Sequence, residues 1–299
     1  MPVTLASRRT PPPRRKVGRT LGSVPDSLPA VSVTAVGVAA LRAYESRRPD
    51  RLFDDPYAAA FHAAGSSLLP VAPGATPKDG LGALFARQVA IRTRFYDDYL
   101  LAAGCAQVVV LAAGLDARAF RLAWPPGVRL FELDLPEVLA FKDEVLAAQG
   151  AEPSCERVVV PADLRGDWAD ALRTAGFDAS VPTAWLAEGL LVYLSREDAE
   201  AMLSTVTELS APGSRVSFEH RSAETRDGLL ARAKATPGAE RVTRLWHGGL
   251  GGTAPEWLRG HGWEPVVVSH ADLAAEYDRP GDETLDGFVT AEYQSSTLR

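Results

Sequence analysis

The sequence predicts an α/β protein, doubly wound around a mostly parallel, seven-stranded sheet. Two observations predict this fold. From Gln107 onward, short apolar runs alternate with segments of helical pattern, and seven such runs occur before the chain ends. Strands that alternate with helices form βαβ units with right-handed crossovers, and these place the strands parallel. The chain has 299 residues, enough for one large α/β domain to bury a core.

The expected elements of this sheet follow in order. The strands are Val108–Leu111, Val128–Asp134, Val158–Val160, Thr183–Ala187, Arg215–Glu219, Glu264–Ser269 and Phe288–Tyr293. The helices are Pro136–Gln149, Trp168–Ala175, Arg196–Leu209 and Pro255–Gly262. The first of these helices starts with proline, a residue suited to the first helical position. Residues 221–252 break the alternation and are expected to form an inserted, partly helical cover.

The segment before Gln107 is predicted to be helical. Ser32 is the expected N-cap of a first helix that Pro49 ends, and a second helical piece follows Asp55-Pro56. A long amphipathic helix is expected from Leu84 to Ala103. We therefore divide the chain into a disordered leader (1–31), a helical N-terminal cover (32–104) and an α/β domain (105–299), packed as one compact domain.

Charge and composition exclude several classes of protein. The net charge is −6, yet residues 1–30 carry six basic residues and one acid, a net +5, which leaves −11 on the remainder. Since affinity for nucleic acid comes largely from neutralising phosphates, an acidic body disfavours such a partner. No apolar run is long enough to span a bilayer, and no apolar stretch follows the basic leader as in a secretory signal. Cys105 and Cys155 have no metal-ligand spacing. We expect a cytoplasmic protein without a metal site.

A small-residue turn follows the first strand, where an open parallel sheet binds its ligand. Ala112 and Gly114 in this turn would let the backbone approach a ligand closely. Twenty residues after Gly114, Asp134 ends the second strand. A carboxylate there can accept hydrogen bonds from both hydroxyls of a ribose.

Acids also follow the next two strands. Asp163 closes the third strand, where the edge of an adenine would lie, and Glu188 closes the fourth. An acidic lining of three successive strand ends suits a nucleoside with a positive charge. It suits the pyrophosphate of a dinucleotide poorly.

These segments resemble the leucine carboxyl methyltransferase family, closest to its actinobacterial small-molecule branch. The resemblance covers roughly residues 32–293 and implies a Rossmann-like class I methyltransferase fold, S-adenosyl-L-methionine as cofactor, and methylation of an oxygen. The matching segments are Leu111-Ala-Ala-Gly-Leu-Asp-Ala-Arg-Ala-Phe-Arg-Leu122, Phe131-Glu-Leu-Asp134, Ala162-Asp-Leu164, Ala187-Glu-Gly-Leu-Leu-Val-Tyr-Leu194 and the region Thr34–Tyr57.

Carried over residue by residue, the resemblance assigns cofactor contacts. Arg87 is implied to pair with the methionyl carboxylate, with Arg92 and Arg94 as rivals on the same segment. By the same comparison, Asp134 would hold the ribose, Glu188 would face the methionine end, and adenine would be flanked by Asp163 and Leu164. Ala112 stands where the family usually has glycine, so a left-handed backbone there would strain alanine.

The methyl acceptor is expected to be a small molecule, most simply one with a carboxylate. A carboxylate is ionised near neutral pH and needs no base, whereas a phenol or alcohol would benefit from one. For a hydroxyl acceptor, His220 is the best-placed base, and His247 is a second candidate in the cover. Tyr193 is a candidate contact to the acceptor, with core packing as an equally good interpretation.

Two other functions stay open on sequence alone. A nicotinamide-dependent dehydrogenase also uses a small-residue turn and an acid twenty residues later, although the missing first glycine and the pair Asp163 and Glu188 disfavour it. A protein that binds small molecules on the same fold without catalysis has no distinguishing sequence feature. The acceptor's identity and the oligomeric state are not determined by the sequence.

Overall fold

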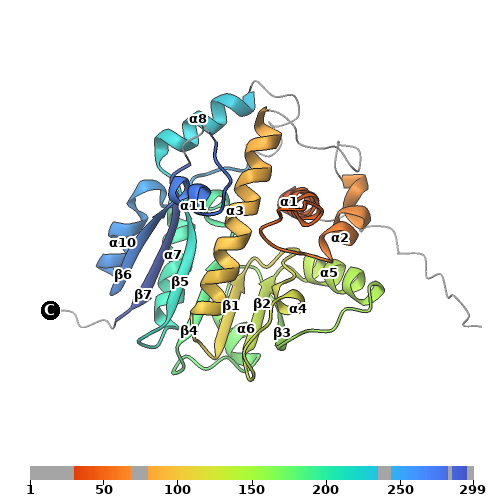
Figure 1. Cartoon of the computed structure of the whole chain (residues 1–299). Coiled ribbons are helices and arrows are strands. Elements are labelled where there is room, and N and C mark those ends of the chain that lie inside the picture. Colours follow the sequence, from red (N-terminus) through yellow and green to blue (C-terminus); the bar gives the residue numbers. More distant parts are fainter. Residues whose placement is uncertain (1–29, 69–79, 235–243, 282–284, 295–299) are drawn as a thin grey trace, which may run out of the picture.

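A computed structural model describes residues 30–68, 80–234, 244–281 and 285–294 (Figure 1). The predicted leader therefore lies almost entirely outside the described residues. Residues 69–79, which belong to a Pro/Gly-rich segment before the long helix, also lie outside them. The division into leader, cover and α/β domain stays a prediction.

A seven-stranded sheet in the order β3-β2-β1-β4-β5-β7-β6 forms the centre of the fold, which confirms the predicted fold class (Figure 1). The strands β1 to β5 pair in parallel, and β7 lies antiparallel between β5 and β6. Their bounds are β1 Gln107–Leu111, β2 Arg129–Asp134, β3 Glu156–Pro161, β4 Thr183–Ala187, β5 Arg215–His220, β6 Trp263–Ser269 and β7 Gly287–Tyr293.

Alternating side chains of the central strands bury both faces of the sheet. On β1, Val108 and Val110 pack into one apolar cluster, while Val109 and Leu111 pack into another on the opposite face. Every residue of β1 is buried. A parallel strand covered on both faces reads as a continuous apolar run, which is why the sequence identified it.

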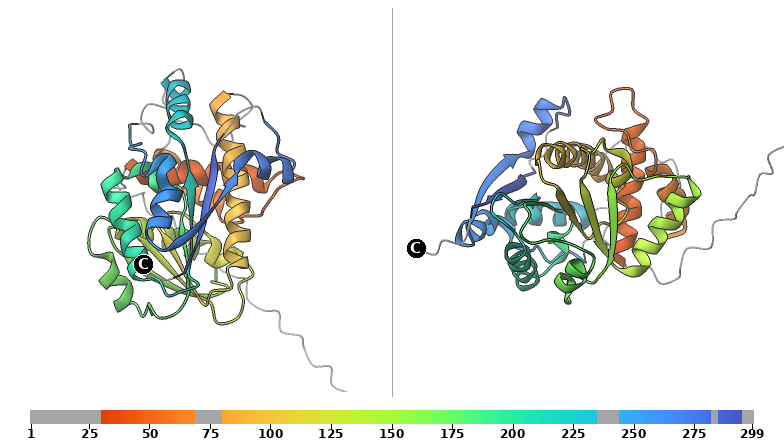
Figure 2. Two further views of the ribbon diagram at one scale, coloured as in Figure 1. Left: turned by 90° about the vertical axis from the view of Figure 1, so that its left-hand side faces the viewer. Right: turned by 90° about the horizontal axis from the view of Figure 1, so that it is seen from below.

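Helices cover the two faces in layers (Figures 1 and 2). Residues of α3 and α11 share one apolar cluster with the sheet, and those of α6, α7 and α10 share the other. The helices are α1 Ala30–Ser46, α2 Ala58–Gly65, α3 Gly80–Ala102, α4 Arg118–Arg121, α5 Pro136–Ala148, α6 Trp168–Thr174, α7 Arg196–Glu208, α8 Ala223–Lys234, α10 Ala254–Gly260 and α11 His270–Glu276.

The helices differ from the sequence expectation mainly at the start of α1 and in two helices, α4 and α11, that were not predicted. The first helix already begins at Ala30, so Ser32 lies inside it and is not its N-cap. The sequence analysis also missed α11 at His270. Its signal was present, since the Ser269 side chain accepts hydrogen bonds from the backbone N–H groups of Ala271 and Asp272.

The N-terminal helices lie over the carboxyl ends of the central strands. Ala35 of α1 approaches the turn after β1 so closely that a Cβ added at Gly114 would lie 3.6 Å from the Ala35 Cβ. Arg42, two turns further along α1, reaches the loop after β4. Helix α1 therefore closes the edge at which parallel sheets bind their ligands.

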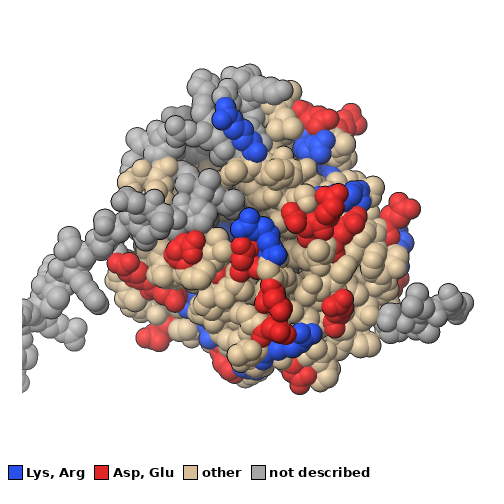
Figure 3. All heavy atoms as spheres, turned by 180° about the vertical axis from the view of Figure 1, so that it is seen from behind, with Lys and Arg blue, Asp and Glu red and all other residues tan. Residues whose placement is uncertain are grey.

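Charged side chains are spread over the outside. Acidic groups are distributed across the face drawn in Figure 3, with basic groups between them. Within the described residues, no helix is both long and apolar enough to cross a membrane.

Candidate active site

The turn after β1 has the backbone geometry of a close-approach loop. Ala112 has φ 50° and Gly114 has φ 47°, so both adopt the left-handed conformation. The N–H of Ala113 donates to the carbonyl of Leu133, which ties the turn to β2. A left-handed backbone costs alanine roughly 1–2 kcal/mol, a cost that glycine avoids.

We expect Ala112→Gly to raise the free energy of unfolding by about 0.5–1 kcal/mol. The substitution removes the left-handed strain, and the entropy that glycine loses on folding offsets part of the gain. Urea unfolding of the two proteins measures the difference. The matched control is Ala117→Gly, at a buried position after the same turn with φ −108°, where glycine should only destabilise. A variant at Ala112 that is less stable than the parent would contradict this account.

Asp134 ends β2 and holds the turn in place. One carboxylate oxygen accepts from the N–H of Gly114 at 2.6 Å, and the other accepts from the N–H of Leu135 at 2.7 Å. Burial raises the pKa of Asp134, although these two hydrogen bonds act in the opposite direction. The carboxylate lies beside the turn, where the sequence analysis expected a ribose.

Asp163 and Leu164 follow β3 in a different environment. The Asp163 carboxylate is exposed and pairs with Arg165, with Nη2 to Oδ2 at 2.7 Å. This hydrogen-bonded pairing is the main cause that lowers the pKa of Asp163. Leu164 is partly buried against the core cluster beneath it. Of the three acids at strand ends, Asp163 is the one most open to solvent.

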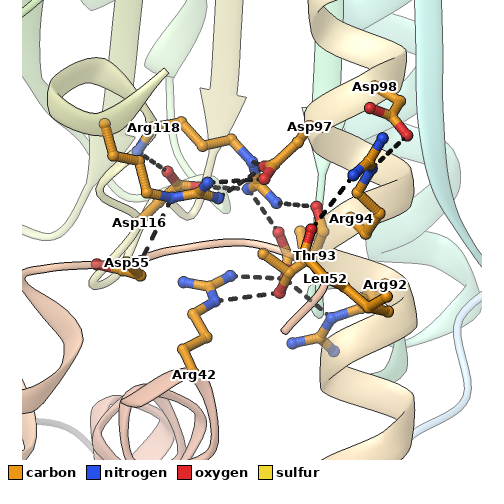
Figure 4. Close-up of polar contacts among 12 residues, drawn as sticks. Arg42, Leu52, Asp55, Arg92, Thr93, Arg94, Asp97, Asp98, Asp116 and Arg118 are labelled. Carbon is orange, nitrogen blue, oxygen red and sulfur yellow. Dashed lines mark hydrogen bonds and ion pairs between the residues drawn. The ribbon is translucent and has the colours of Figure 1, made fainter. Parts of the chain in front are cut away.

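Glu188, just after β4, is the centre of a buried ion-pair network. Figure 4 labels the three arginines of this network, Arg42, Arg92 and Arg118. Its side chain is only 7% exposed, and its oxygens lie 2.7 Å from Arg42 Nη2, 2.9 Å from Arg92 Nε and 2.7 Å from Arg118 Nη1. Burial alone would raise the pKa of Glu188, but Arg118, Arg42 and Arg92 together hold it well below its ordinary range. Glu188 is therefore a fixed negative charge.

The network extends to both sides of Glu188. Arg118 also pairs with Asp97 on α3, at 2.7 Å, and with Asp116 in the turn after β1. On the other side, Arg92 pairs with Glu219 at 3.0 Å, and Glu219 accepts from the N–H of Gly189 at 2.8 Å. These contacts lock α1, α3, the turn after β1 and the ends of β4 and β5 into one arrangement.

The sequence analysis missed most of this network. Arg42, Asp97, Asp116, Arg118 and Glu219 were not singled out, although Asp116 and Arg118 lie inside the motif that carried the resemblance. What distinguishes these residues is that their charged side chains are buried. Burial is a property of the structure and cannot be predicted from residue type alone. Charged residues are seldom fully buried unless they are paired.

The three arginines proposed for the methionyl carboxylate occupy different places on α3. Arg92 is buried at Glu188. Arg94 is exposed and pairs with Asp98 of the same helix. Arg87 lies toward the helix N-terminus, and its guanidinium lies directly against Gly281, where an added Cβ would overlap it. The structure thus places Arg92, and not Arg87, in contact with Glu188, and the role of Arg87 stays a prediction.

A small pocket that opens to solvent lies at the carboxyl end of β5. His220 lines it, and the buried Nδ1 of this histidine has no hydrogen-bond partner. Burial lowers the pKa of His220. The facing wall contains His270, a residue that the sequence analysis missed, at the start of α11.

The two other acceptor-side candidates differ in position. Tyr193 ends a short 3₁₀ helix, Leu191–Tyr193, and lies within electrostatic range of Arg92. The side chain of His247 is exposed, while its backbone N–H donates to the carbonyl of Val192 at 2.8 Å. Neither residue lines the pocket.

The residues at the sheet edge fit a nucleoside cofactor with a charged amino-acid end. The left-handed turn presents small residues, and the partly buried Asp134 carboxylate lies beside it. Arginines gather around Glu188 at the end of β4, the strand next to β1 in the sheet. Among the described residues, no group of three or more histidines, cysteines and acids is arranged to hold a metal ion.

Comparisons with known proteins identify the family of this chain. The family model of the leucine carboxyl methyltransferases matches residues 35–207. A protein of Parafrankia sp. is 51% identical over 273 residues, which span 88% of this chain and 87% of the relative. One of Mycobacteroides abscessus is 45% identical over 276 residues, 87% of this chain and 88% of that protein. Both relatives are named as S-adenosyl-L-methionine-dependent methyltransferases.

Solved structures agree in fold. A methyltransferase-titled structure from Thermobifida fusca has a TM-score of 0.52 and 23% identity, and covers 87% of this chain and 94% of its own. The structure of a DUF574 family protein from Streptomyces avermitilis has a TM-score of 0.54 and 18% identity, and covers 86% of this chain and 97% of its own. With the family model matching more than half of its length, this chain belongs to the leucine carboxyl methyltransferase family and is an S-adenosylmethionine-dependent methyltransferase.

Proposed function

We propose that this methyltransferase transfers its methyl group to an oxygen of a small molecule, and that this oxygen belongs to a carboxylate, so that the product is a methyl ester. The observation that carries the proposal is the state of the histidine at the acceptor side. His220 lines the pocket at the carboxyl end of β5, but its buried Nδ1 has no hydrogen-bond partner, and no carboxylate of the described residues is hydrogen-bonded to its ring. A base is usually oriented by such a partner, and a carboxylate acceptor needs no base.

The acid that influences His220 electrostatically, Asp286, is already engaged. Asp286 accepts hydrogen bonds from the backbone N–H and the hydroxyl of Ser222. It therefore acts on His220 only through space, where it partly opposes the lowering of the pKa by burial. Membership of a family named for carboxyl methylation supports the same acceptor class.

The residues at the sheet edge would hold the cofactor in the roles that their positions suggest. Asp134 would accept from the ribose, Ala112 and Gly114 would lie under it, and Asp163 with Leu164 would flank the adenine. Arg87 or Arg92 would pair with the methionyl carboxylate near Glu188. When bound, S-adenosylmethionine supplies an electrophilic methyl on a positively charged sulfur.

The work left to the protein is positioning. An acceptor oxygen that is already ionised must be held in line with the methyl group and kept from water, and such placement supplies much of the acceleration. The buried ion pairs around Glu188 fix the elements that form both sides of the site. This rigidity is suited to a displacement that needs geometry more than proton transfer.

Methylation of a phenolic or alcoholic hydroxyl, with His220 as base, is the second candidate. One observation favours it, since the unpartnered Nδ1 of His220 is an acceptor available for a proton. With its pKa lowered, this imidazole is neutral at pH 7. Tyr193, within electrostatic range of Arg92, would then contact the acceptor.

We expect the rate of methyl transfer to vary less than about twofold between pH 6 and 8, because a carboxylate with an ordinary pKa of about 4 stays ionised throughout. His220→Ala should retain most activity. The measurement is a pH–rate profile of both proteins with methyl-labelled cofactor and an acid found by screening carboxylic acids.

The same assay also shows which result would contradict a carboxylate acceptor. A base at His220 would make the parent rate fall as pH drops through the lowered pKa of this residue, because the imidazole then becomes protonated. Its substitution would abolish activity, and the product would survive mild hydroxide, unlike an ester. The control is His261→Ala, a distant exposed histidine stacked on Trp257, which should change nothing under either hypothesis.

A further inference from the structure

The pocket lies where β5 ends and β7 begins, and the acids in its lining already have hydrogen-bond partners. Its lining includes two acids, Glu219 and Asp286, and both are engaged by the protein itself. Glu219 accepts from the N–H of Gly189 and from Arg92, and Asp286 accepts from Ser222. Because both carboxylates are paired within the protein, neither is a candidate for binding a ligand.

Arg221, unlike these two acids, has no partner among the described residues. It lines the same pocket, is partly buried, and forms no hydrogen bond and no ion pair within 4.0 Å with any residue that the structure describes. Burial is the largest influence on its guanidinium and lowers its pKa, although Glu219 and Asp286 act on it from a distance in the other direction. Partial removal of a guanidinium from water is costly when no anion is close to it.

Two imidazoles flank this guanidinium. His270 is only 3% exposed, and its Nε2 has no partner, as is the case for Nδ1 of His220. Burial, with Arg87 and Arg221 nearby, lowers the pKa of His270 to about 4, so this ring adds no second positive charge at neutral pH. The pocket thus contains one unpaired cation and two neutral rings that can each donate or accept.

We propose that this pocket is a subsite for the carboxylate of the methyl acceptor, and that Arg221 is the residue that recognises it. The proposal rests on the function proposed above and names the residue that selects an anionic acceptor. A planar guanidinium matches a carboxylate in two parallel hydrogen bonds. Glu219 joins this subsite to Arg92 and to the Gly189 backbone, directly beside Glu188.

A carboxylate could reach this pocket from two sources, the acceptor or the methionyl end of the cofactor. The sheet order favours the acceptor, because Gly114 and Asp134 lie at the ends of β1 and β2 while the pocket lies at β5 and β7, beyond β4. The experiment separates the two sources.

The chain has only five histidines, so their ring signals in a nuclear magnetic resonance spectrum report on this pocket without crowding. The probe is benzoate, with benzamide as its uncharged isostere, added to the full-length protein saturated with S-adenosylmethionine. His220→Gln and His270→Gln assign the two signals. We expect benzoate, and not benzamide, to shift both. In Arg221→Gln the benzoate affinity should fall about tenfold or more, and Arg221→Lys should keep part of it.

The control is Arg94→Gln, an exposed arginine on α3 that should leave the benzoate response unchanged. Equal shifts from benzoate and benzamide, or an unchanged response in Arg221→Gln, would overturn the proposal. So would a tenfold loss of affinity for S-adenosylmethionine in Arg221→Gln that decarboxylated S-adenosylmethionine does not show, because the cofactor's own carboxylate would then occupy the pocket. None of these readouts involves methyl transfer, so a hydroxyl acceptor would overturn the proposed function and leave this test intact.

Discussion

Glu188→Ala should lower the free energy of unfolding by about 3–5 kcal/mol, the usual cost of leaving a buried charge without its partner. The carboxylate faces three arginines, and among the described residues it is the only ion-pair partner of Arg42, at 2.7 Å. Arg92 and Arg118 retain other acids, so the loss falls mainly on the joint between α1 and the loop after β4. Guanidinium unfolding followed by circular dichroism measures the change.

Two further variants test this interpretation of Glu188. Glu188→Gln keeps the shape and one acceptor oxygen, so its loss should be smaller than that of the alanine variant. The matched control is Glu156→Ala, which breaks an exposed pair with Arg129 and should cost less than about 1 kcal/mol. A loss at Glu188 no larger than at Glu156 would show that the network adds nothing to stability.

Asp134→Ala should weaken S-adenosylmethionine binding by about 1.5–3 kcal/mol, which is the range for hydrogen bonds to a charged group. The carboxylate already orders the turn after β1 by accepting from Gly114, so its removal loosens the surface on which the cofactor would lie. Calorimetric titration of the cofactor measures the affinity.

Comparison of acids at other strand ends sharpens this test. Asp163→Ala should have a smaller effect, because that carboxylate is exposed and already paired with Arg165. Asp170→Ala, in the first turn of α6, serves as the surface control and should leave binding unchanged. An Asp134→Ala protein that binds within twofold of the parent would remove this residue from the cofactor site.

The fold was predictable because the signals are local. The buried parallel strands β1 to β5 are short apolar runs, and each of the seven strands of the sheet was located within about two residues. Helix termini were less accurate, as the start of α1 at Ala30 shows, since caps and propensities are weak beside tertiary contacts. Helix α11 was missed because it follows β6 directly, with no connecting residues between Ser269 and His270 to separate the two elements.

The residues of the candidate site that directly follow strands were predictable from the sequence. The contacts between residues of distant helices and strands were not. Ala112, Gly114 and Asp134 follow strands, so sheet topology alone brings them together. Arg42 meets Glu188 across 146 residues, and no local pattern announces that pairing. Arg221 and His270 likewise share a pocket only because β7 inserts between β5 and β6. Burial of charge is a property of the finished packing.

The ion pair between Arg42 and Glu188 also has a consequence for biosynthesis. Arg42 leaves the ribosome 146 residues ahead of its partner. At ordinary translation speeds its guanidinium therefore waits roughly 7–30 s before Glu188 is even joined to the chain. During that interval α1 can pack on α2 and α3, the elements made soon after it, but it gains the contact that fixes it over the sheet only once β4 has emerged.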